Sequence, residues 1–461
     1  MNLYLSSEKT ALIVVMLANL LTPFMSSAMN LAIPAIGTEF SASTRLLSWL
    51  VASYSLTAAG FMLPFGRLAD IVGRRKVFVT GMLLFSIFTL LSGTARSIQS
   101  MIFFRTCQGI ASSMIFSTGT AIVTSVYPLQ ARGRALGLTA SCAYIGMSLG
   151  PVLGGGMSHH FGWRSIFYLT TLIGIFATLL ATWGLRAEWA DSKGERFDLI
   201  GSTCYVLALA ATLYGLSSVF QEEWAKYILG TGLALMVIFL CYETKQDYPI
   251  FQVGLFRRNT IFAFSNLAAM ISYSATFAIG FLISLDLQVV RGYDSQVAGL
   301  ILLSQPLIMA IVSPFTGTLS DRIEPRLIAS WGMGITTLGL FFLIFITADT
   351  TLWTIVANLV LLGIGSALFA VPNNIAIMGS VEKELYGVAS STLGTMRLVG
   401  GAVSMAVVTS ILSIYIGDSD LGRDYAHMLV AASRTAYIVL TVICIAGILA
   451  SLAGRNLKSR H

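Results

Sequence analysis

Three charged side chains lie inside long apolar stretches of this 461-residue chain: Asp286, Arg105 and Arg397. A carboxyl group in a low-dielectric setting can load and release a proton, so Asp286 is a candidate for proton coupling. An arginine stays charged, and it can only attract an anion or shift the ionisation of a nearby acid. Because a charge is costly to keep in apolar surroundings, we expect functional roles here, most strongly at Arg105.

Each of the three residues also has a structural alternative. Asp286 lies shortly before Arg291, near the end of its apolar stretch, where water could simply solvate it. The arginines could be tied to backbone carbonyl groups.

A polar stripe runs along the first apolar stretch, where Asn19, Ser26 and Asn30 recur at helical spacing. Such a stripe should face protein or water rather than lipid, so we expect it to line a central cavity. The full set of predicted substrate-binding residues adds aromatic and polar side chains from other stretches: Asn19, Ser26, Asn30, Tyr54, Ser112, Phe116, Tyr144, Asn373 and Arg397. The embedded charges favour a neutral, zwitterionic or anionic amphiphile over a dication.

A glycine-rich basic loop lies between the second and third apolar stretches, at Gly66-Arg67-Leu68-Ala69-Asp70-Ile71-Val72-Gly73-Arg74-Arg75-Lys76. Its glycines allow a sharp turn and close helix approach. Asp70 can accept N–H bonds at a helix start and pair with guanidinium groups. Similar spacing recurs at Gly317-Thr318-Leu319-Ser320-Asp321. We expect Gly66, Asp70, Gly73, Arg74 and Asp321 to act as a gate, although a basic loop with a helix cap is the simpler alternative.

The fifth apolar stretch carries Gly146, Gly150, Pro151 and Gly154. The glycines form a small face for tight helix contact, and the proline bends the helix. This too is either a gating element or an ordinary packing face with a kink.

The elements that position these residues must be membrane helices. The chain is 56% hydrophobic and 11% charged, whereas a soluble globular protein has about 25% charged residues, so a soluble enzyme is excluded. Apolar stretches this long predict helical spans rather than barrel strands. Fourteen are expected, at about 10–36, 46–69, 76–95, 99–126, 134–158, 164–186, 198–219, 225–242, 259–287, 297–319, 326–347, 351–378, 386–416 and 432–453.

Lysines and arginines cluster in the even-numbered loops, which predicts that these loops and both termini are cytoplasmic. The acidic stretch at 418–424 is expected outside, and the basic tail at 454–460 inside. The net charge of +7 is explained by this topology, without nucleic acid. We find no metal or disulfide pattern among the histidines and cysteines, and no phosphate-binding loop, so no cofactor and no enzymatic activity are expected.

The repeated Gly–Asp element predicts two six-helix halves with two extra helices between them. The expected boundaries are 1–190 for the first half, 191–257 for the linker helices and 258–461 for the second half.

The motifs together resemble those of the major facilitator superfamily, fourteen-span drug:H⁺ antiporter branch. The loop at 66–76 resembles the family's loop signature, and the glycines of the fifth span resemble the signature of its exporters. Arg105 with Gln108-Gly109 matches an element linked to proton coupling. Further matching stretches are Phe161–Phe167, Phe197–Gly201, Gly292-Tyr293, Ala298-Gly299 and Pro306. One departure is Met25, which stands where the branch usually has a membrane aspartate, and this puts an acid's role there in doubt.

The resemblance implies a monomeric transporter of the cell membrane, surrounded by lipid, that exports small amphiphilic compounds in exchange for protons by alternating access. The alternatives are an exporter of a lipid or metabolite, a carrier not coupled to protons, and a receptor that keeps the carrier fold.

Overall fold

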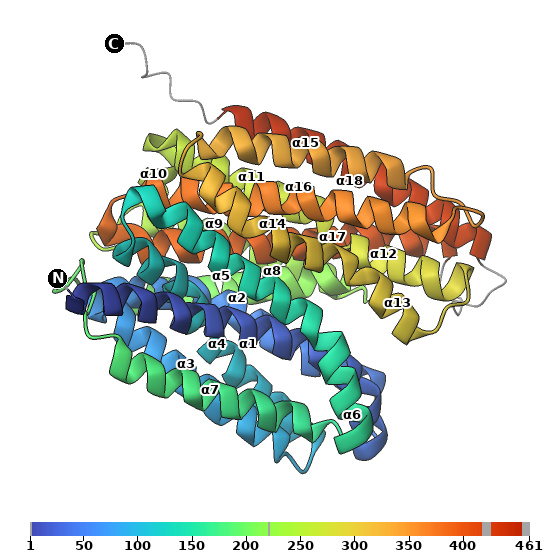
Figure 1. Ribbon diagram of the computed structural model, residues 1–461, viewed down its shortest axis with the longest axis horizontal. Helices are drawn as coiled ribbons and strands as arrows, with labels where there is room; N and C mark the ends of the chain where they lie inside the picture. The colour runs from blue at the N-terminus through green and yellow to red at the C-terminus, as the bar shows by residue number, and fades with distance from the viewer. Residues whose placement is uncertain (1, 220–221, 417–425, 454–461) are drawn as a thin grey trace.

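The computed structural model describes residues 2–219, 222–416 and 426–453 (Figure 1). All regular secondary structure in these ranges is helical. Fourteen helical segments are long and apolar enough to cross a membrane, as the sequence predicts. The acidic stretch at 418–424 and the basic tail at 454–460 lie outside the described residues.

Seven helices and one π-helical segment (η1) form the first half: α1 (Asn2–Phe40), α2 (Thr44–Val72), α3 (Arg74–Gly93), α4 (Ile98–Val126), α5 (Leu129–Leu149), η1 (Gly150–Gly154), α6 (Gly155–Phe161) and α7 (Arg164–Gly184). The fifth span runs through α5, η1 and α6 without a break. The chain then forms a hairpin of α8 (Leu199–Ser218) and α9 (Ala225–Glu243).

The second half comprises α10 (Val253–Arg258), α11 (Thr260–Thr276), α12 (Ile279–Leu285), η2 (Asp286–Val290), α13 (Ser295–Leu302), α14 (Ser304–Ser320), α15 (Pro325–Leu343), α16 (Leu352–Gly379), η3 (Lys383–Leu385), α17 (Tyr386–Ile416) and α18 (Ala426–Ala453). Its ninth and tenth spans are each built from consecutive short segments. The domain boundary predicted after residue 190 falls between α7 and α8, and the one predicted after residue 257 falls within α10.

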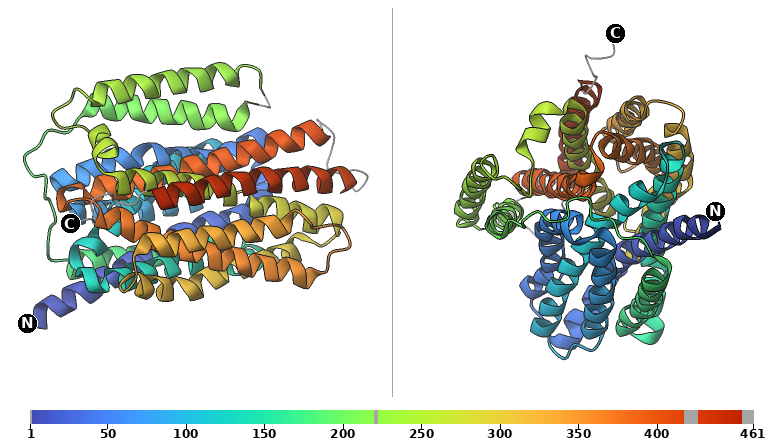
Figure 2. Two further views of the ribbon diagram at one scale, coloured as in Figure 1. Left: turned by 90° about the horizontal axis from the view of Figure 1, so that it is seen from above. Right: turned by 90° about the vertical axis from the view of Figure 1, so that its left-hand side faces the viewer.

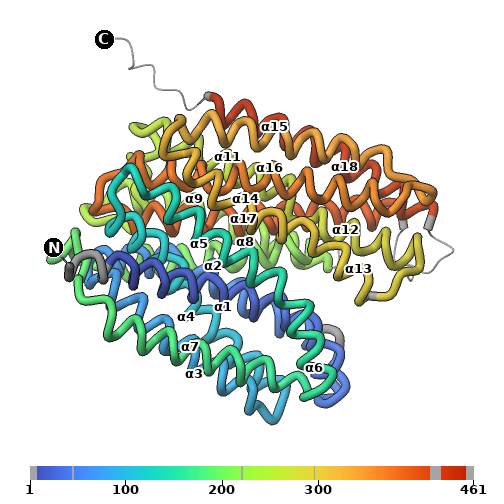
Figure 3. Tube along the Cα trace, viewed as in Figure 1, coloured from blue at the N-terminus to red at the C-terminus, as the bar shows by residue number. Residues whose placement is uncertain are grey.

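Each half has its own apolar core. The two halves pack together where α14 lies against α5 and α17 lies against α2, and Figure 3 traces the chain through both. The α8–α9 hairpin lies along the outside of the bundle (Figure 2), where α8 contacts α2 of the first half and α17 of the second. The hairpin therefore covers the seam between the halves.

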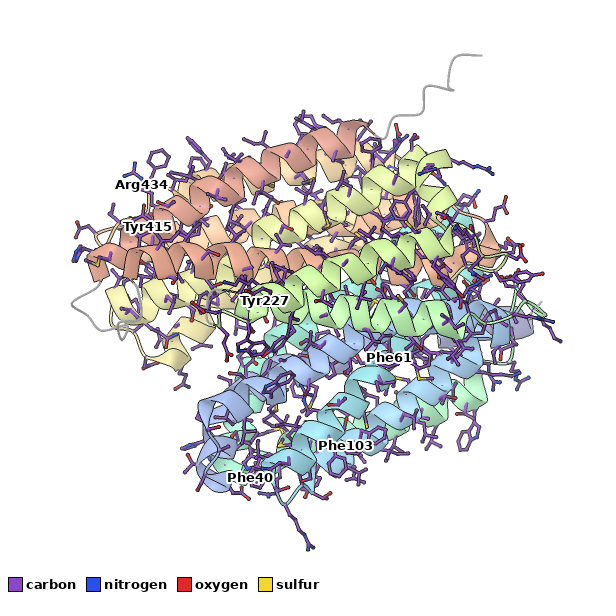
Figure 4. The ribbon with its side chains drawn as sticks, turned by 180° about the vertical axis from the view of Figure 1, so that it is seen from behind. Phe40, Phe61, Phe103, Tyr227, Tyr415 and Arg434 are labelled. Carbon is purple, nitrogen blue, oxygen red and sulfur yellow. The ribbon has the colours of Figure 1, made fainter. Side chains whose placement is uncertain are left out.

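The outer faces of the bundle are apolar, as a lipid environment requires. Large hydrophobic side chains project outward from most helices, including Phe103 of α4 and Tyr227 of α9 (Figure 4). The chain is a multi-pass membrane protein.

The two ends of the bundle differ. At the end that carries Asp70, here called the Asp70 end, helix ends from both halves are in direct contact. At the opposite end, called the His159 end, a cavity of about 690 Å³ separates α1, η1 and α6 from α13. Leu31, Pro151, His159 and Gln296 are among its lining residues.

Candidate functional site

A central cavity of about 430 Å³ lies between the two halves. Helices α1, α2, α4 and α5 line it from the first half, and α11, α16 and α17 from the second. Six of the predicted substrate-binding residues line it: Asn19, Ser26, Tyr54, Phe116, Tyr144 and Arg397. The volume falls within the usual range for sites of small molecules.

The other three predicted substrate-binding residues lie elsewhere. Asn30 is exposed and does not line the cavity. Ser112 is buried behind the wall, with its Oγ 2.8 Å from the hydroxyl of Tyr54. Asn373 is buried and donates to the carbonyl of Ser265 at 3.1 Å, while its neighbour Asn374 lines the cavity instead. The two asparagines are adjacent in the helix, so one makes a structural hydrogen bond and the other faces the cavity. The sequence pattern does not show which of them faces the cavity.

The cavity wall is largely apolar and aromatic, with one charged side chain among the described residues, Arg397. Its guanidinium lies 5.7 Å from the ring centroid of Tyr273, and its Nε has no hydrogen-bond partner. No acidic residue in the described part of the chain lines this cavity. The wall therefore presents one uncompensated positive charge beside aromatic rings.

Arg105 lies directly behind the wall and is only 2% exposed. Its guanidinium is 4.4 Å from the ring centroid of Tyr54, and Nη1 donates to Oε1 of Gln108 at 2.6 Å. Gln108 in turn donates to Thr89 at 2.6 Å. Arg105 has no acidic partner among the described residues, so its charge is stabilised by the Tyr54 ring and one amide.

Asp286 lies far from this arrangement, in η2 at the His159 end. Its Oδ2 accepts a 2.8 Å hydrogen bond from Nε of Arg291, which also donates to the carbonyls of Thr347 and Thr350. The carboxylate borders a separate small cavity with Arg434 and Tyr437. The structure thus brings together neither Asp286 with Arg105 nor Asp286 with the central cavity.

The predicted loop around Asp70 closes one end of the seam. Both Asp70 oxygens accept backbone N–H groups at the start of α17, from Gly387 at 3.0 Å and from Val388 at 3.1 Å. Arg74 donates its Nε to Asp70 at 2.8 Å and one Nη to Asp191 at 2.9 Å. Asp70 therefore caps a helix of the opposite half while held by its own arginine.

Two glycines make this contact sterically possible. A Cβ added at Gly66 would lie 2.6 Å from the carbonyl oxygen of Gly387, so only a glycine lets the helices approach this closely. Gly73 has a φ of 124° at the sharp turn into α3, a conformation that other residues rarely adopt.

Asp321 of the second half makes a similar contact with the first half. Its two carboxylate oxygens accept the N–H groups of Gly133 at 2.7 Å and of Arg134 at 3.1 Å, at the start of α5. Gly317 packs against Gly133 so closely that an added Cβ would lie 2.2 Å from its carbonyl oxygen. Each half thus supplies one aspartate that accepts two backbone N–H groups near the start of a helix of the other half.

The segment between α7 and α8 ties both halves at this end, which the sequence does not predict. Ser192 donates its N–H to the carbonyl of Asp70 at 3.0 Å and its hydroxyl to that of Glu384 at 3.3 Å. Arg67 pairs with Glu195. The ring centroid of Tyr386 lies 5.5 Å from the guanidinium carbon of Arg74 and 5.7 Å from that of Arg132.

The glycines of the fifth span pack against α1 of the same half. A Cβ added at Gly146 would lie 2.3 Å from the carbonyl oxygen of Leu20, and one added at Gly150 would lie 2.4 Å from Cβ of Ser27. At Gly154 it would lie 2.6 Å from Cβ of Ala28. Pro151 falls in the π-helical segment η1, where the α-helical hydrogen bonding is interrupted.

Comparison with known proteins places this architecture in a family. The family model described as "Major Facilitator Superfamily" matches residues 15–256 and 265–459. The riboflavin transporter RibZ of Clostridioides difficile is 28% identical over 95% of both chains. The multidrug resistance protein Stp of Mycobacterium tuberculosis is 32% identical over 84% of this chain and 72% of its own length.

Two further similarities agree. The cephamycin export protein CmcT of Amycolatopsis lactamdurans is 29% identical over 95% of this chain and 93% of its own. The crystal structure of the human organic anion transporter MFSD10 shares the fold, with a TM-score of 0.69 at 16% identity, over 96% of this chain and 99% of that one. The chain belongs to the major facilitator superfamily, whose members are transporters and not enzymes.

Proposed function

We propose that this transporter exports a small amphiphilic compound in exchange for protons, by alternating access of the central cavity, in the plasma membrane of a bacterium. The observation that carries the proposal is the cavity at the seam between two halves that are joined at one end by reciprocal aspartate caps. Rocking of two such halves about a midplane site is the expected motion. Export is supported by the relatives Stp and CmcT, whose names denote drug resistance and cephamycin export.

The aspartate caps supply a mechanism for switching. Opening the Asp70 end requires that Asp70 leave Gly387 and Val388, and that Asp321 leave Gly133 and Arg134. These are charge-assisted bonds to helix starts, so each aspartate stabilises the closed end. Water, lipid headgroups or substrate-driven contacts must compensate the separated groups in the other state. We place the Asp70 end in the cytoplasm, in line with the basic loops.

The cavity wall supports a neutral or anionic substrate with an aromatic or extended apolar part. Arg397 offers an unpaired cation, Tyr273 and Phe277 offer ring faces, and Asn19 and Asn374 offer amides. A dication would meet the positive charge of Arg397 with no acidic wall residue in the described chain to offset it. The relative RibZ, named a riboflavin transporter, is consistent with an aromatic substrate.

For proton coupling we propose Arg105 and Asp286 as the contributing residues. Arg105 contacts the wall residue Tyr54, so a change in cavity occupancy can alter its environment. Asp286 is the embedded acid of the second half, and its pairing with Arg291 can change when the His159 end moves.

The second candidate is a carrier that is not coupled to protons. One observation favours it: the described residues place no acid in the cavity wall, and Met25, which stands at the usual aspartate position, is buried in the core of the first half. An exporter of a lipid or metabolite is compatible with the same cavity.

Purified protein in liposomes separates these candidates. A pH gradient is imposed, and the movement of anionic, neutral and dicationic amphiphiles is followed together with internal pH. We expect gradient-driven transport of an anionic or neutral compound with counterflow of protons, weakened in Asp286→Asn and Arg105→Gln but kept in the exposed control Asp247→Asn. Transport that does not depend on the pH gradient would favour the uncoupled carrier. Proton coupling that is retained in both Asp286→Asn and Arg105→Gln would contradict the assignment of these two residues.

A further inference from the structure

Two carboxyl groups face each other at the foot of the α8–α9 hairpin. Asp198 caps α8, and its Oδ1 accepts the N–H of Gly201 at 2.8 Å and the hydroxyl of Tyr242 at 3.3 Å. Glu243 ends α9, and its Oε2 accepts the N–H of Phe251 at 2.9 Å. The second oxygen of each group, Oδ2 of Asp198 and Oε1 of Glu243, is buried and accepts no hydrogen bond from any residue that the structure describes.

These two unpartnered oxygens border the same small space. A Cβ added at Gly201 would lie 2.3 Å from Oε1 of Glu243 and 2.5 Å from Oδ2 of Asp198. Both oxygens therefore lie next to the same point above Gly201, and Glu243 is only 2% exposed.

Basic side chains in the described ranges do not offset the two acids. Neither forms an ion pair with a lysine or arginine in the described part of the chain. The other titratable groups near them are the Tyr242 hydroxyl and the Cys204 thiol, both of which are neutral at physiological pH. The helices α2 and α17, which pack on the hairpin, place apolar side chains such as Leu63 and Val388 on this side.

Two ionised carboxylates this close repel each other strongly, and a buried pair is stable when a proton or a cation lies between the oxygens. A single proton is sufficient here, because the O–H of one group would donate to the orphan oxygen of the other and leave no unsatisfied acceptor. We propose that Asp198 and Glu243 form a proton-binding site at the foot of the hairpin, separate from the central cavity, in which Oδ2 and Oε1 share one proton.

The site is placed to respond to the transport cycle. The hairpin above it bridges the seam: Tyr205 of α8 is hydrogen-bonded to Thr395 of α17 at 3.0 Å, and Tyr214 of α8 stacks on Trp49 of α2 with ring centroids 5.4 Å apart. When α2 and α17 separate, the hairpin cannot keep both contacts. The affinity of the pair for its proton therefore differs between the two states if the foot of the hairpin moves with them.

Infrared spectroscopy and thermal melting of the purified full-length protein test this site without a transport assay. At neutral pH we expect a carbonyl stretch of a protonated carboxyl group that is absent in both Glu243→Gln and Asp198→Asn. The exposed Asp247→Asn, close by in sequence, is the matched control and keeps the band.

Melting adds a second readout. The parent should lose stability as the pH rises above about 4.3, the ordinary pKa of a free glutamate, because the unfolded chain then releases a proton that the folded state still holds. In Glu243→Gln the amide donates to Asp198 permanently, so this pH dependence is reduced. An unchanged band and an unchanged pH dependence in both variants would overturn the proposal. So would stabilisation of the parent, but not of Glu243→Gln, by Na⁺ or Ca²⁺ at high pH, since the pair would then be a cation site. Neither result bears on export through the central cavity.

Discussion

At the scale of single residues, the charges inside the bundle divide into two kinds. Asp70 and Asp286 are paired with arginines, whereas Arg105 and Arg397 have no acidic partner in the described chain. An unpaired embedded charge is retained only where something compensates it. For Arg105 that compensation is the Tyr54 ring and Gln108. Arg397 faces the cavity instead, and we propose that a substrate is its partner.

Replacing Arg397 with Gln should therefore change selectivity rather than abolish transport. Loss of a hydrogen bond to a charged group costs about 1.5–3 kcal/mol, so the apparent affinity for an anionic substrate should fall about 10-fold to 150-fold. A neutral compound of the same shape should lose far less. Concentration dependence of uptake into liposomes measures both, with Arg397→Lys as the variant that keeps the charge. Equal losses for the two compounds would show that Arg397 is a structural residue.

The residue types and their spacing predict much of this site. The stripe of Asn19 and Ser26 reaches the cavity as expected, because the first span is a regular helix and the spacing fixes its face. Asn30 does not, since it lies farther along the helix, beyond the cavity. The bonding of Asp70 to a helix start and to Arg74 is also as predicted, but the identity of that helix is not, because its start lies more than 300 residues away and local spacing carries no such pairing. Whether these residues gate transport stays a prediction.

At the scale of elements, each copy of the repeated Gly–Asp segment contacts the beginning of a helix in the opposite half. Asp70 binds the start of α17 and Asp321 binds the second turn of α5, and each receiving helix has a glycine at the contact, Gly387 or Gly133, that lets the opposite helix approach closely. The sequence indicates the two aspartates, because the Gly–Asp spacing occurs twice. The receiving glycines carry only one signal that could have identified them: they occupy corresponding positions near the starts of the fifth and thirteenth spans.

A methyl group at Gly133 should loosen this contact. Its Cβ would lie 2.3 Å from the backbone carbonyl of Gly317 and 2.5 Å from Asp321, so the closed Asp70 end must shift. Overpacking of this kind costs about 1–3 kcal/mol, and the state open at the Asp70 end should become more populated by about 5-fold to 150-fold.

Spin labels at Lys76 and Lys383, which are exposed in opposite halves at the Asp70 end, report this change as a longer distance distribution. Gly334→Ala is the control, because an added Cβ there meets nothing within 4 Å in helix α15. A distance distribution in Gly133→Ala that matches the parent and the control would mean that this contact does not hold the end closed.

At the scale of the whole molecule, the two ends of the bundle differ in how the halves meet. The Asp70 end is closed by both aspartate caps and by the segment between α7 and α8, while a cavity opens between the halves at the His159 end. Composition and span lengths are sufficient to predict the fourteen helices, because lipid leaves the backbone no other regular arrangement. They do not predict which end is closed, since that balance depends on contacts between residues far apart in the chain.

We propose that the cavity opens alternately to each face of the membrane. A single cysteine placed at Ala143, a cavity-lining residue, reports this opening in a variant whose five native cysteines are replaced. A membrane-impermeant thiol reagent is applied to right-side-out and to inside-out vesicles, with and without a transported compound. We predict labelling from both sides, with the ratio of the two rates changed by the compound. Labelling from one side only, under every condition, would contradict alternating access.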